Sequence, residues 1–382
     1  MKKIITIWWG NGQSNLLDAI QKYLPENMYH ISSIVSMSDD GRTTWELMRK
    51  FQKELDLHLP PPGDLRRCLF MMSCSDRKNQ FMQYLETIIQ IDATISQLTI
   101  WDYFKLVGAD DDFKKHLKKS TSLWKKILDF ILPLHTSIKG HKVWNVLMAN
   151  LYYNLDKNYN TMLEYMHQIL EVHGNIIPVT TQKAYIRAIL WNGDIIETQD
   201  QISNIASYTS GIADFELAED SVHAYQHKNV SHVIEDADYI IITPWDIFTS
   251  IISNFVIGWV KECISKSNAK IIYIANICNK WGEMQWLTHL DIIYKIERFL
   301  GRRIDIFICN NQRLQLSPEE KQRFQSHISV KWWDYLYLSA GERSYLEAQE
   351  IEIYEDALVD ITTLYKHNQK KLVKLLENIL MH

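Results

Sequence analysis

The sequence predicts an α/β protein with a mostly parallel sheet and a helical insertion. Short apolar runs rich in isoleucine alternate with helical patterns, and the first run leads at once into a glycine-containing turn and an amphipathic helix. Parallel strands that are buried on both faces have such continuous apolar sequences, and strands that alternate with helices are typical of a parallel sheet. The expected strands are residues 3–7, 31–36, 176–180, 188–196, 239–243, 270–275 and 304–308.

The composition is that of an ordinary globular protein. Hydrophobic residues make up 46% and charged residues 23% of the 382 residues, and the formal net charge of -5 gives no electrostatic reason to expect nucleic acid or an anionic membrane as a partner. The five cysteines form no CxxC pair, which favours reduced thiols. No apolar stretch approaches the roughly 18 residues of a membrane span, and the N-terminal run is too short for a signal peptide. We therefore expect a cytoplasmic protein.

The chain is predicted to form one large domain, residues 1–330, followed by a C-terminal extension, residues 331–382, that ends in an amphipathic helix over 370–380. A lysine-rich, mostly helical stretch at about residues 80–138 has no obvious site, and we interpret it as a helical insertion. Its paired helices could serve the interface of a homo-oligomer.

A glycine turn follows the first expected strand and leads into a helix over residues 14–23. Backbone N–H groups in such a turn, together with the helix dipole, can hold an anion such as phosphate. The spacing does not complete the dinucleotide fingerprint, because the third glycine would fall on Asn15. A plain tight turn is the alternative. The candidate ligand-binding residues of this turn are Trp8, Trp9, Gly10, Asn11 and Gly12.

Two adjacent carboxylates, Asp39 and Asp40, lie just after the second expected strand, at the end of the strand where α/β sheets bind ligands. They could hold Mg²⁺ through oxygen, or bind a ribose hydroxyl. Thr43 and Thr44 could donate hydrogen bonds to phosphate oxygens. An acidic surface turn is the alternative interpretation.

Three prolines and a glycine at residues 60–63 predict a rigid turn that places Asp64 at the start of a helix. Asp64 could be only the N-cap of that helix, or it could be a third carboxylate for a metal or substrate. Arg66 or Arg67 could then make a bidentate contact to phosphate.

Further polar side chains occur at helix starts and strand ends in the rest of the chain. His141 and Asn145 open a predicted helix; a lone histidine is more often structural than ligand-binding, and Asn145 is a candidate amide contact. Thr249 and Ser250 follow one apolar strand, and Asn276 follows another, at the beginning of a polar segment that runs to residue 283. Because the carboxyl ends of parallel strands meet at one edge, these residues predict a composite cleft there.

Six of these segments resemble, in the same order, the motifs of the family of 2-phospho-L-lactate transferases and gluconeogenesis factors. Each motif alone is weak, but six in order are specific, and residues 173–180 match as well. The similarity covers roughly residues 3–75 and 139–310. As they stand in this sequence, the motifs are WWGNG, DDGRTTW, PPGDLR, GHKVWN, TPWDIFTS and GEMQW.

The resemblance implies a Rossmann-like three-layer sandwich and one of two functions. One branch of the family transfers phospholactate or a related phospho-acid from a guanosine diphosphate carrier to a deazaflavin precursor, with Mg²⁺. The other binds UDP-sugars and supports cell-envelope synthesis and growth on gluconeogenic carbon. The Asp-Asp-Gly-x-Thr/Ser-Thr/Ser pattern makes the second branch the better match. The residues that the resemblance places at the site are Gly10–Gly12, Asp39, Asp40, Asp64, Asn145 and Thr249.

The leading hypothesis is therefore a gluconeogenesis-factor-like protein that binds a nucleotide-diphosphate ligand. The alternative is a phospho-acid transferase in which Asp39, Asp40 or Asp64 holds Mg²⁺, so that the metal neutralises the diphosphate leaving group while an acceptor hydroxyl attacks. A nicotinamide oxidoreductase is disfavoured by the incomplete glycine spacing, and NAD is not expected.

Glycine and tryptophan occur in abnormal numbers, 13 each, where average usage predicts about 27 glycines. Seven of the tryptophans stand where the family has glycine. Glycine is used where a backbone must approach a phosphate, and the indole of a tryptophan at such a position would fill the space meant for the ligand. We hypothesise that the source organism reads UGA as glycine and that the gene was translated with UGA as tryptophan. A degenerate paralogue that has lost binding is the alternative. The tryptophans at glycine positions of the family are Trp8, Trp9, Trp45, Trp144, Trp245, Trp259 and Trp286.

Overall fold

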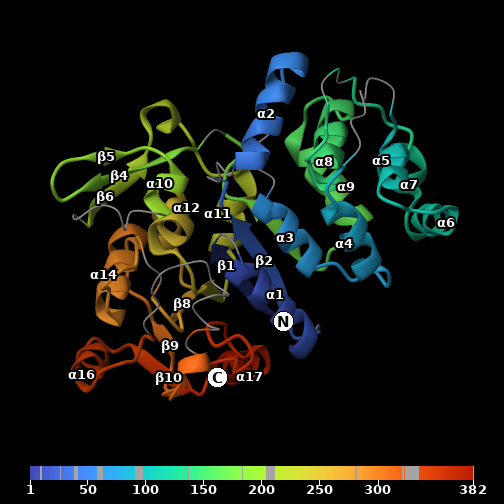
Figure 1. Cartoon of the computed structure of the whole chain (residues 1–382). Coiled ribbons are helices and arrows are strands. Elements are labelled where there is room, and N and C mark those ends of the chain that lie inside the picture. The colour runs from blue at the N-terminus through green and yellow to red at the C-terminus, as the bar shows by residue number, and fades with distance from the viewer. Residues whose placement is uncertain are drawn as a thin grey trace. The chain divides into compact units, whose positions relative to one another are not determined.

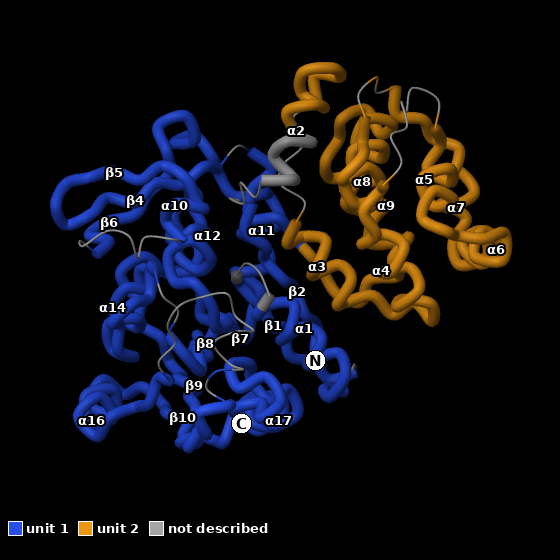
Figure 2. Tube along the Cα trace, in the orientation of Figure 1, with its two compact units in different colours: residues 1–38, 177–382 blue, residues 39–176 orange. Residues whose placement is uncertain are grey.

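The computed structural model forms two compact units, residues 1–38 with 177–382 (unit 1) and residues 39–176 (unit 2) (Figures 1 and 2). Each unit is described by itself. For Trp8, Asn11 and residues 42–48 only the backbone is described. The residues that the structure describes are 1–8, 11–25, 27–37, 42–57, 63–90, 98–133, 135, 137–182, 184–203, 211–279, 282–320, 322 and 335–381.

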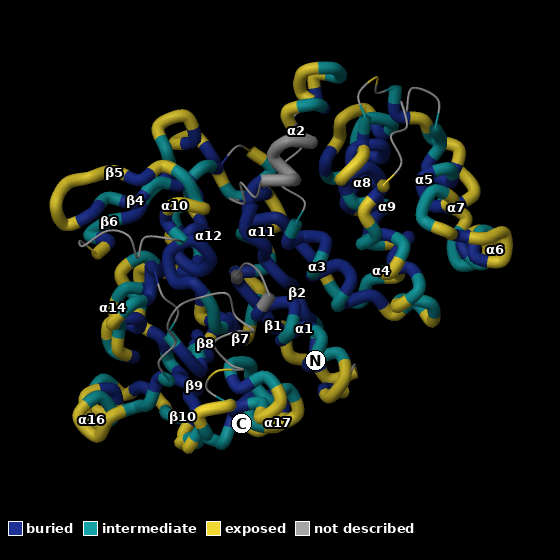
Figure 3. Tube along the Cα trace, in the orientation of Figure 1, coloured by how far each residue is buried: buried dark blue, intermediate teal, exposed yellow. Residues whose placement is uncertain are grey.

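Seven parallel strands form the central sheet, in the order β10-β9-β8-β7-β1-β2-β3. Isoleucines at 0 or 1% exposure fill its middle strands, including Ile5, Ile241 and Ile272. Figure 3 shows these strands among the buried parts of the unit. Burial on both faces explains why the strands read as continuous apolar runs. The strands are β1 (Lys2–Trp8), β2 (Tyr29–Val35), β3 (Asn175–Pro178), β7 (Tyr239–Ile242), β8 (Lys270–Ile274), β9 (Ile306–Asn310) and β10 (Glu352–Asp356).

Helices cover both faces of this sheet. The connection β1–α1–β2 moves along the sheet in one direction, and β7–α13–β8–α14–β9 moves in the other. Because crossovers between parallel strands are right-handed, α1 lies on one face and α13 and α14 lie on the opposite face. Helix α17 packs against α1, and α11 packs against α13. The predicted Rossmann-like three-layer fold is confirmed. The helices are α1 (Asn11–Tyr23), α11 (Lys228–Glu235), α13 (Val260–Lys266), α14 (His289–Leu300), α16 (Ala340–Ala348) and α17 (Gln369–Met381).

A small antiparallel sheet, in the order β5-β4-β6, lies between β3 and β7 in the chain. The single strand expected at 188–196 is a hairpin, because the chain turns at Gly193, whose φ is 88°. β6 was not predicted. The elements of this region are β4 (Ile186–Leu190), β5 (Ile195–Ile196), α10 (Gln199–Ser203), β6 (Ile212–Leu217), η2 (Glu219–Ser221), the π-helix η3 (Ile247–Ile252) and α12 (Ser253–Phe255).

Unit 2 is helical. Its helices between residues 78 and 127 share an aromatic core, in which the ring of Phe81 lies 5.9 Å from Phe104, 5.8 Å from Phe113 and 5.4 Å from Trp124. The predicted insertion is therefore helical, but the compact helical unit runs from residue 39 to 176 rather than from 80 to 138. Its helices are α2 (Arg42–Leu55), α3 (Gly63–Met71), α4 (Lys78–Glu86), α5 (Ile100–Leu106), α6 (Asp111–Ser120), α7 (Ser122–Ile127), α8 (Val143–Asn154) and α9 (Tyr159–Ile169).

The C-terminal residues belong to unit 1. β10 pairs in parallel with β9, from Glu352 opposite Ile306 to Asp356 opposite Asn310. The predicted division at residue 330 does not appear among the compact units, because residues 177–382 fall in one of them. The amphipathic helix expected over 370–380 is α17. None of the helices in the described part of the chain is long and apolar enough to cross a membrane.

His289, the first residue of α14, gives the fold a dependence on pH. Its side chain is 1% exposed, and its ring packs at 71° to that of Phe307 with the centroids 5.2 Å apart. Burial lowers the pKa of His289 to about 4, although the carboxylates of Glu342 and Glu355 oppose the shift. The folded protein thus favours the neutral ring.

We predict that acid destabilises the protein through this histidine. Because the folded pKa lies below the unfolded value of 6.5, the contribution is fully present above pH 6.5. It falls by about 3 kcal/mol as the pH drops to 4. Urea denaturation across this pH range should show a smaller loss of the free energy of unfolding for His289→Gln than for the wild type. The control variant His223→Gln, at an exposed position, should follow the wild type. Equal pH dependence in all three proteins would contradict the assignment. Burial also lowers the pKa of His367, and that contribution is common to all three.

Candidate functional site

The sheet of unit 1 reverses its strand order at β1. From β1 the chain proceeds to β2 on one side, whereas β7 pairs with β1 on the other side, with Ile4 opposite Tyr239 and Ile7 opposite Ile242. Loops that leave the carboxyl ends of two such neighbouring strands diverge, and open α/β sheets bind ligands in the resulting crevice. The strand order therefore fixes where a ligand site is expected.

A buried polar cluster fixes the start of α1 at this point. Thr6 Oγ1 donates to Ser33 Oγ at 2.9 Å, which joins β1 to β2. Gln13 Nε2 donates to Thr6 Oγ1 at 3.2 Å and also to Ser33 Oγ. All three side chains are buried. The first turn of α1, with Gly12, is thereby held at the carboxyl ends of β1 and β2.

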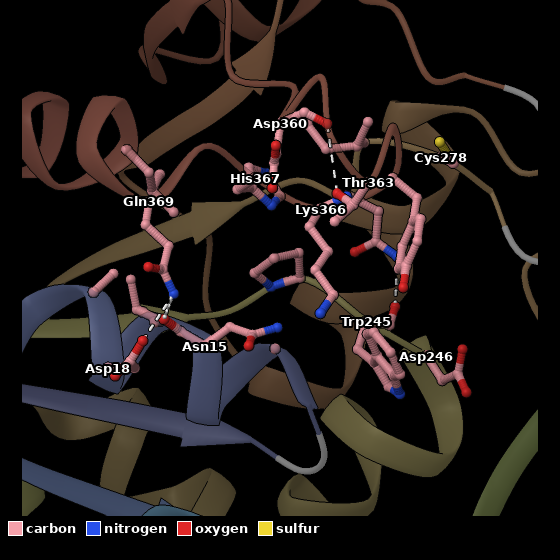
Figure 4. A pocket seen from close by; sticks show the side chains of 18 of the residues that line it. Asn15, Asp18, Trp245, Asp246, Cys278, Asp360, Thr363, Lys366, His367 and Gln369 are labelled. Atoms are coloured by element: carbon pink, nitrogen blue, oxygen red, sulfur yellow. Dashed lines mark hydrogen bonds between the residues drawn. The ribbon is translucent and has the colours of Figure 1, made fainter. Parts of the chain in front are cut away.

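A cavity of about 580 Å³ opens beside this turn, within unit 1 (Figure 4). This volume lies in the range of small-ligand pockets. Its walls come from α1, from the loops that follow β7 and β8, and from the segment that leads into α17. The lining residues are Gly12, Asn15, Leu16, Asp18, Ala19, Lys22, Pro244, Trp245, Asp246, Asn276, Ile277, Cys278, Asp360, Thr363, Tyr365, Lys366, His367, Gln369 and Leu372.

The structure brings two of the predicted site residues, Gly12 and Asn276, to this cavity. Asn276 Nδ2 donates to the carbonyl of Trp245 at 2.8 Å, which ties the loop after β8 to the loop after β7. Among the predicted residues, Trp9, Gly10, Asp39 and Asp40 lie outside the described residues, and for Trp8, Asn11, Thr43 and Thr44 no side chain is described.

Four predicted residues, Asp64, Arg66, His141 and Asn145, are buried in unit 2. The carboxylate of Asp64, in the first turn of α3, lies 3.3 Å from the guanidinium of Arg67. Arg66 forms a 2.9 Å ion pair with Glu86, so its guanidinium already has an anionic neighbour. His141 Nε2 lies 3.4 Å from Lys50 Nζ. The side-chain oxygen of Asn145 is buried and has no hydrogen-bond partner among the described residues.

The predicted magnesium set of Asp39, Asp40 and Asp64 stays a prediction. The described residues contain no group of three or more His, Cys, Asp or Glu side chains that could hold a metal ion. Of the predicted set, only Asp64 is among the described residues.

Glu283 is a buried residue that the sequence interpretation did not single out. It is 6% exposed. Its Oε2 accepts hydrogen bonds from the N–H groups of Phe248 (2.6 Å) and Thr249 (2.9 Å), and its Oε1 accepts from Thr249 Oγ1 at 2.5 Å. The carboxylate thus satisfies two backbone donors that the first turn of η3 leaves without an intrahelical partner.

The side chain of Thr249, which was predicted to bind a ligand, is therefore hydrogen-bonded to Glu283 within the protein. Ser250 is also inside η3, fully buried, and its hydroxyl has no hydrogen-bond partner among the described residues. The signal for Glu283 was present in the sequence, because it is the acidic residue of the GEMQW motif.

Comparisons with known proteins agree with this architecture. The family model described as 2-phospho-L-lactate transferase CofD matches residues 4–358. The chain is 24% identical over 380 residues to the gluconeogenesis factor of Bacillus subtilis (strain 168), which covers 99% of this chain and 98% of that protein. It is 23% identical over 383 residues to a candidate gluconeogenesis factor of Thermotoga maritima, with 99% of both covered. A crystal structure of a UPF0052 family member from Bacillus halodurans shares the fold, with a TM-score of 0.72 at 19% identity over 98% of this chain and 99% of that one.

The Glu283 contact predicts a graded loss of stability. Glu283→Ala leaves two buried N–H groups without an acceptor and should cost about 3 kcal/mol, whereas Glu283→Gln keeps one acceptor oxygen and should cost about 1 kcal/mol. The exposed Glu262→Ala serves as control and should unfold as the wild type does. Chemical denaturation measures all three. If alanine and glutamine cost the same, the carboxylate does not stabilise the first turn of η3.

Proposed function

Since the chain belongs to the CofD family and is gluconeogenesis-factor-like over nearly its whole length, we propose that it binds a nucleotide diphosphate of the UDP-sugar type in the unit 1 cavity. In this proposal the protein senses or carries the ligand in support of cell-envelope and carbon metabolism.

The observation that carries the proposal is the position of the cavity at the reversal of strand order between β1 and β7. Gly12 places the start of α1 in its wall. The first turn of α1 has no acidic residue. Its backbone N–H groups and the positive end of the helix dipole therefore suit a diphosphate. The volume of about 580 Å³ suits a ligand of nucleotide size.

Thermal-shift titration tests the proposal. We expect UDP-N-acetylglucosamine and UDP to raise the melting temperature in a concentration-dependent way, because a ligand that binds only the folded state stabilises it. NAD is the control and should leave the melting temperature unchanged. Stabilisation by NAD alone, or by no nucleotide, would contradict the proposal.

A second candidate is a phospho-acid transferase, which is the activity named in the matching family model. In that reaction, Asp64 with Asp39 and Asp40 would hold Mg²⁺, and the metal would supply charge neutralisation of the diphosphate leaving group. Stabilisation by GDP only in the presence of Mg²⁺ would favour this candidate over the first one.

We further propose that several tryptophans replace glycines because UGA codons were translated as tryptophan. Two of the tryptophans at family glycine positions support this: Trp259 has φ 74° and Trp286 has φ 65°. A bulky residue at positive φ is an outlier, while glycine adopts this conformation freely. Both side chains are exposed, at 60 and 77%, so no packing compensates for the strain.

Trp144 provides a contrast, because it is fully buried in α8, 5.0 Å from the ring of Phe70, and its indole N–H has no partner among the described residues. UGG codons at Trp144, Trp259 and Trp286 would refute the proposal. Mass spectrometry of the protein from its own host would show which residue is inserted.

The backbone strain predicts an unusual response to substitution. Trp259→Gly and Trp286→Gly should each stabilise the protein by about 1 kcal/mol, because relief of the left-handed conformation exceeds the entropic cost of glycine. Trp191→Gly is the matched control: this side chain is 74% exposed, and the residue is not among the described residues with positive φ. It should be neutral or slightly destabilising. Thermal denaturation compares the three variants, and destabilisation by all of them would oppose the strain argument.

A further inference from the structure

One wall of the cavity comes from a part of the chain beyond the family match. The match ends at residue 358, and the wall consists of the turn after β10 and the start of α17, from Asp360 to Leu372. Gln369 Nε2 closes this wall onto α1, where it donates to the carbonyl of Asn15 at 3.3 Å and to Asp18 Oδ2 at 3.1 Å. The C-terminal segment is therefore fastened over the start of α1.

Lys366 projects from this segment into the cavity, toward Asn15 and Trp245 (Figure 4). Among the described residues it has no carboxylate partner, and its ammonium lies 5.8 Å from the centre of the Tyr365 ring. Two of the three carboxylates that line the cavity, Asp18 and Asp360, are engaged elsewhere. Asp18 pairs with Lys22 at 2.6 Å, and Asp360 accepts hydrogen bonds from the N–H and hydroxyl of Thr362. A cation held in this way favours an anionic group of a ligand near the first turn of α1.

Two buried hydrogen-bond acceptors lack partners at the same cavity. Asn276 uses its amide nitrogen on the carbonyl of Trp245, and its oxygen has no partner among the described residues. Burial lowers the pKa of His367 and the backbone of Ala275 opposes that shift, whereas Nε2 of the ring has no hydrogen-bond partner among the described residues. In the tautomer of the neutral ring that carries its proton on Nδ1, Nε2 is a hydrogen-bond acceptor.

Buried acceptors without partners are costly, and a ligand with N–H donors would satisfy them. The rest of the lining includes the apolar side chains of Leu16, Ala19, Pro244, Ile277 and Leu372. A planar heterocycle with N–H groups matches both properties, since it offers apolar faces and polar edges.

We propose that residues 360–369 complete the ligand site, with Lys366 binding the diphosphate and Asn276 and His367 accepting hydrogen bonds from the base of a nucleotide. The inference deepens the proposed function and rests on it. It makes the C-terminal segment a determinant of which base is bound.

Isothermal titration calorimetry on the full chain tests this division of roles. The probes are UDP, GDP and inorganic diphosphate, which lacks a base. Lys366→Gln should weaken the binding of a nucleotide and of inorganic diphosphate by roughly tenfold, as expected for loss of a charge-assisted hydrogen bond. His367→Asn keeps a neutral side chain with a hydrogen-bond donor and removes Nε2. It should weaken nucleotide binding and leave diphosphate binding unchanged.

Lys370→Gln is the matched control, because it removes the same charge from an exposed position on α17 outside the cavity lining. It should bind every probe as the wild type does. One outcome is that the wild type binds a nucleotide and that both Lys366→Gln and His367→Asn bind it with wild-type affinity. In that case this inference fails, while the proposed function stands. If the wild type binds no nucleotide, both fail. Should His367→Asn lower the melting temperature, Lys366→Gln with inorganic diphosphate decides the matter.

Discussion

The pairing of β1 with β2 on one side and β7 on the other is the constraint on which the rest of unit 1 depends. A central parallel strand has helices on both faces, and its neighbours are reached by crossovers in opposite directions. The first turn of α1 and the loops after β7 and β8 consequently meet at the same edge of the sheet. The cavity follows from this topology, and its chemistry follows from the side chains that these loops carry.

Buried polar groups determine how firmly that edge is built. Gln13 joins α1 to β1 and β2, and Glu283 joins the loop after β8 to the first turn of η3. Each satisfies donors or acceptors that would otherwise be buried without partners, which is costly in an apolar interior. Glu283 also places a negative charge beside η3. An anionic ligand is therefore better accommodated at α1, where no acidic residue lies in the first turn.

The sequence was most informative where one physical signal dominated. Strands β7 and β8 consist mainly of buried isoleucine, and β1 contains three buried isoleucines, so their burial on both faces was readable from the sequence. β10 was missed because its side chains are only partly buried, and β6 because its buried residues, Ile212, Phe215 and Leu217, do not alternate regularly with partly exposed ones. Gly12 and Asn276 both follow strands and line the cavity, and their role in ligand binding stays a prediction. Glu283, Lys366 and His367 were not recognised, because their neighbours come from distant parts of the chain and no local pattern indicates such contacts. Unit 2 likewise depends on contacts between distant parts of the chain, because α8 packs against α4 and α5, and α9 packs against α7.

The contact between α1 and α17 has a consequence for biosynthesis. These helices are separated by about 350 residues, and at roughly 5–20 residues per second a ribosome needs tens of seconds to make the intervening chain. During that interval the apolar face of α1 is without its native cover, and the pocket wall built by residues 360–372 does not exist. The cavity is thus incomplete until translation nears its end, and chaperones have time to act on the exposed surface.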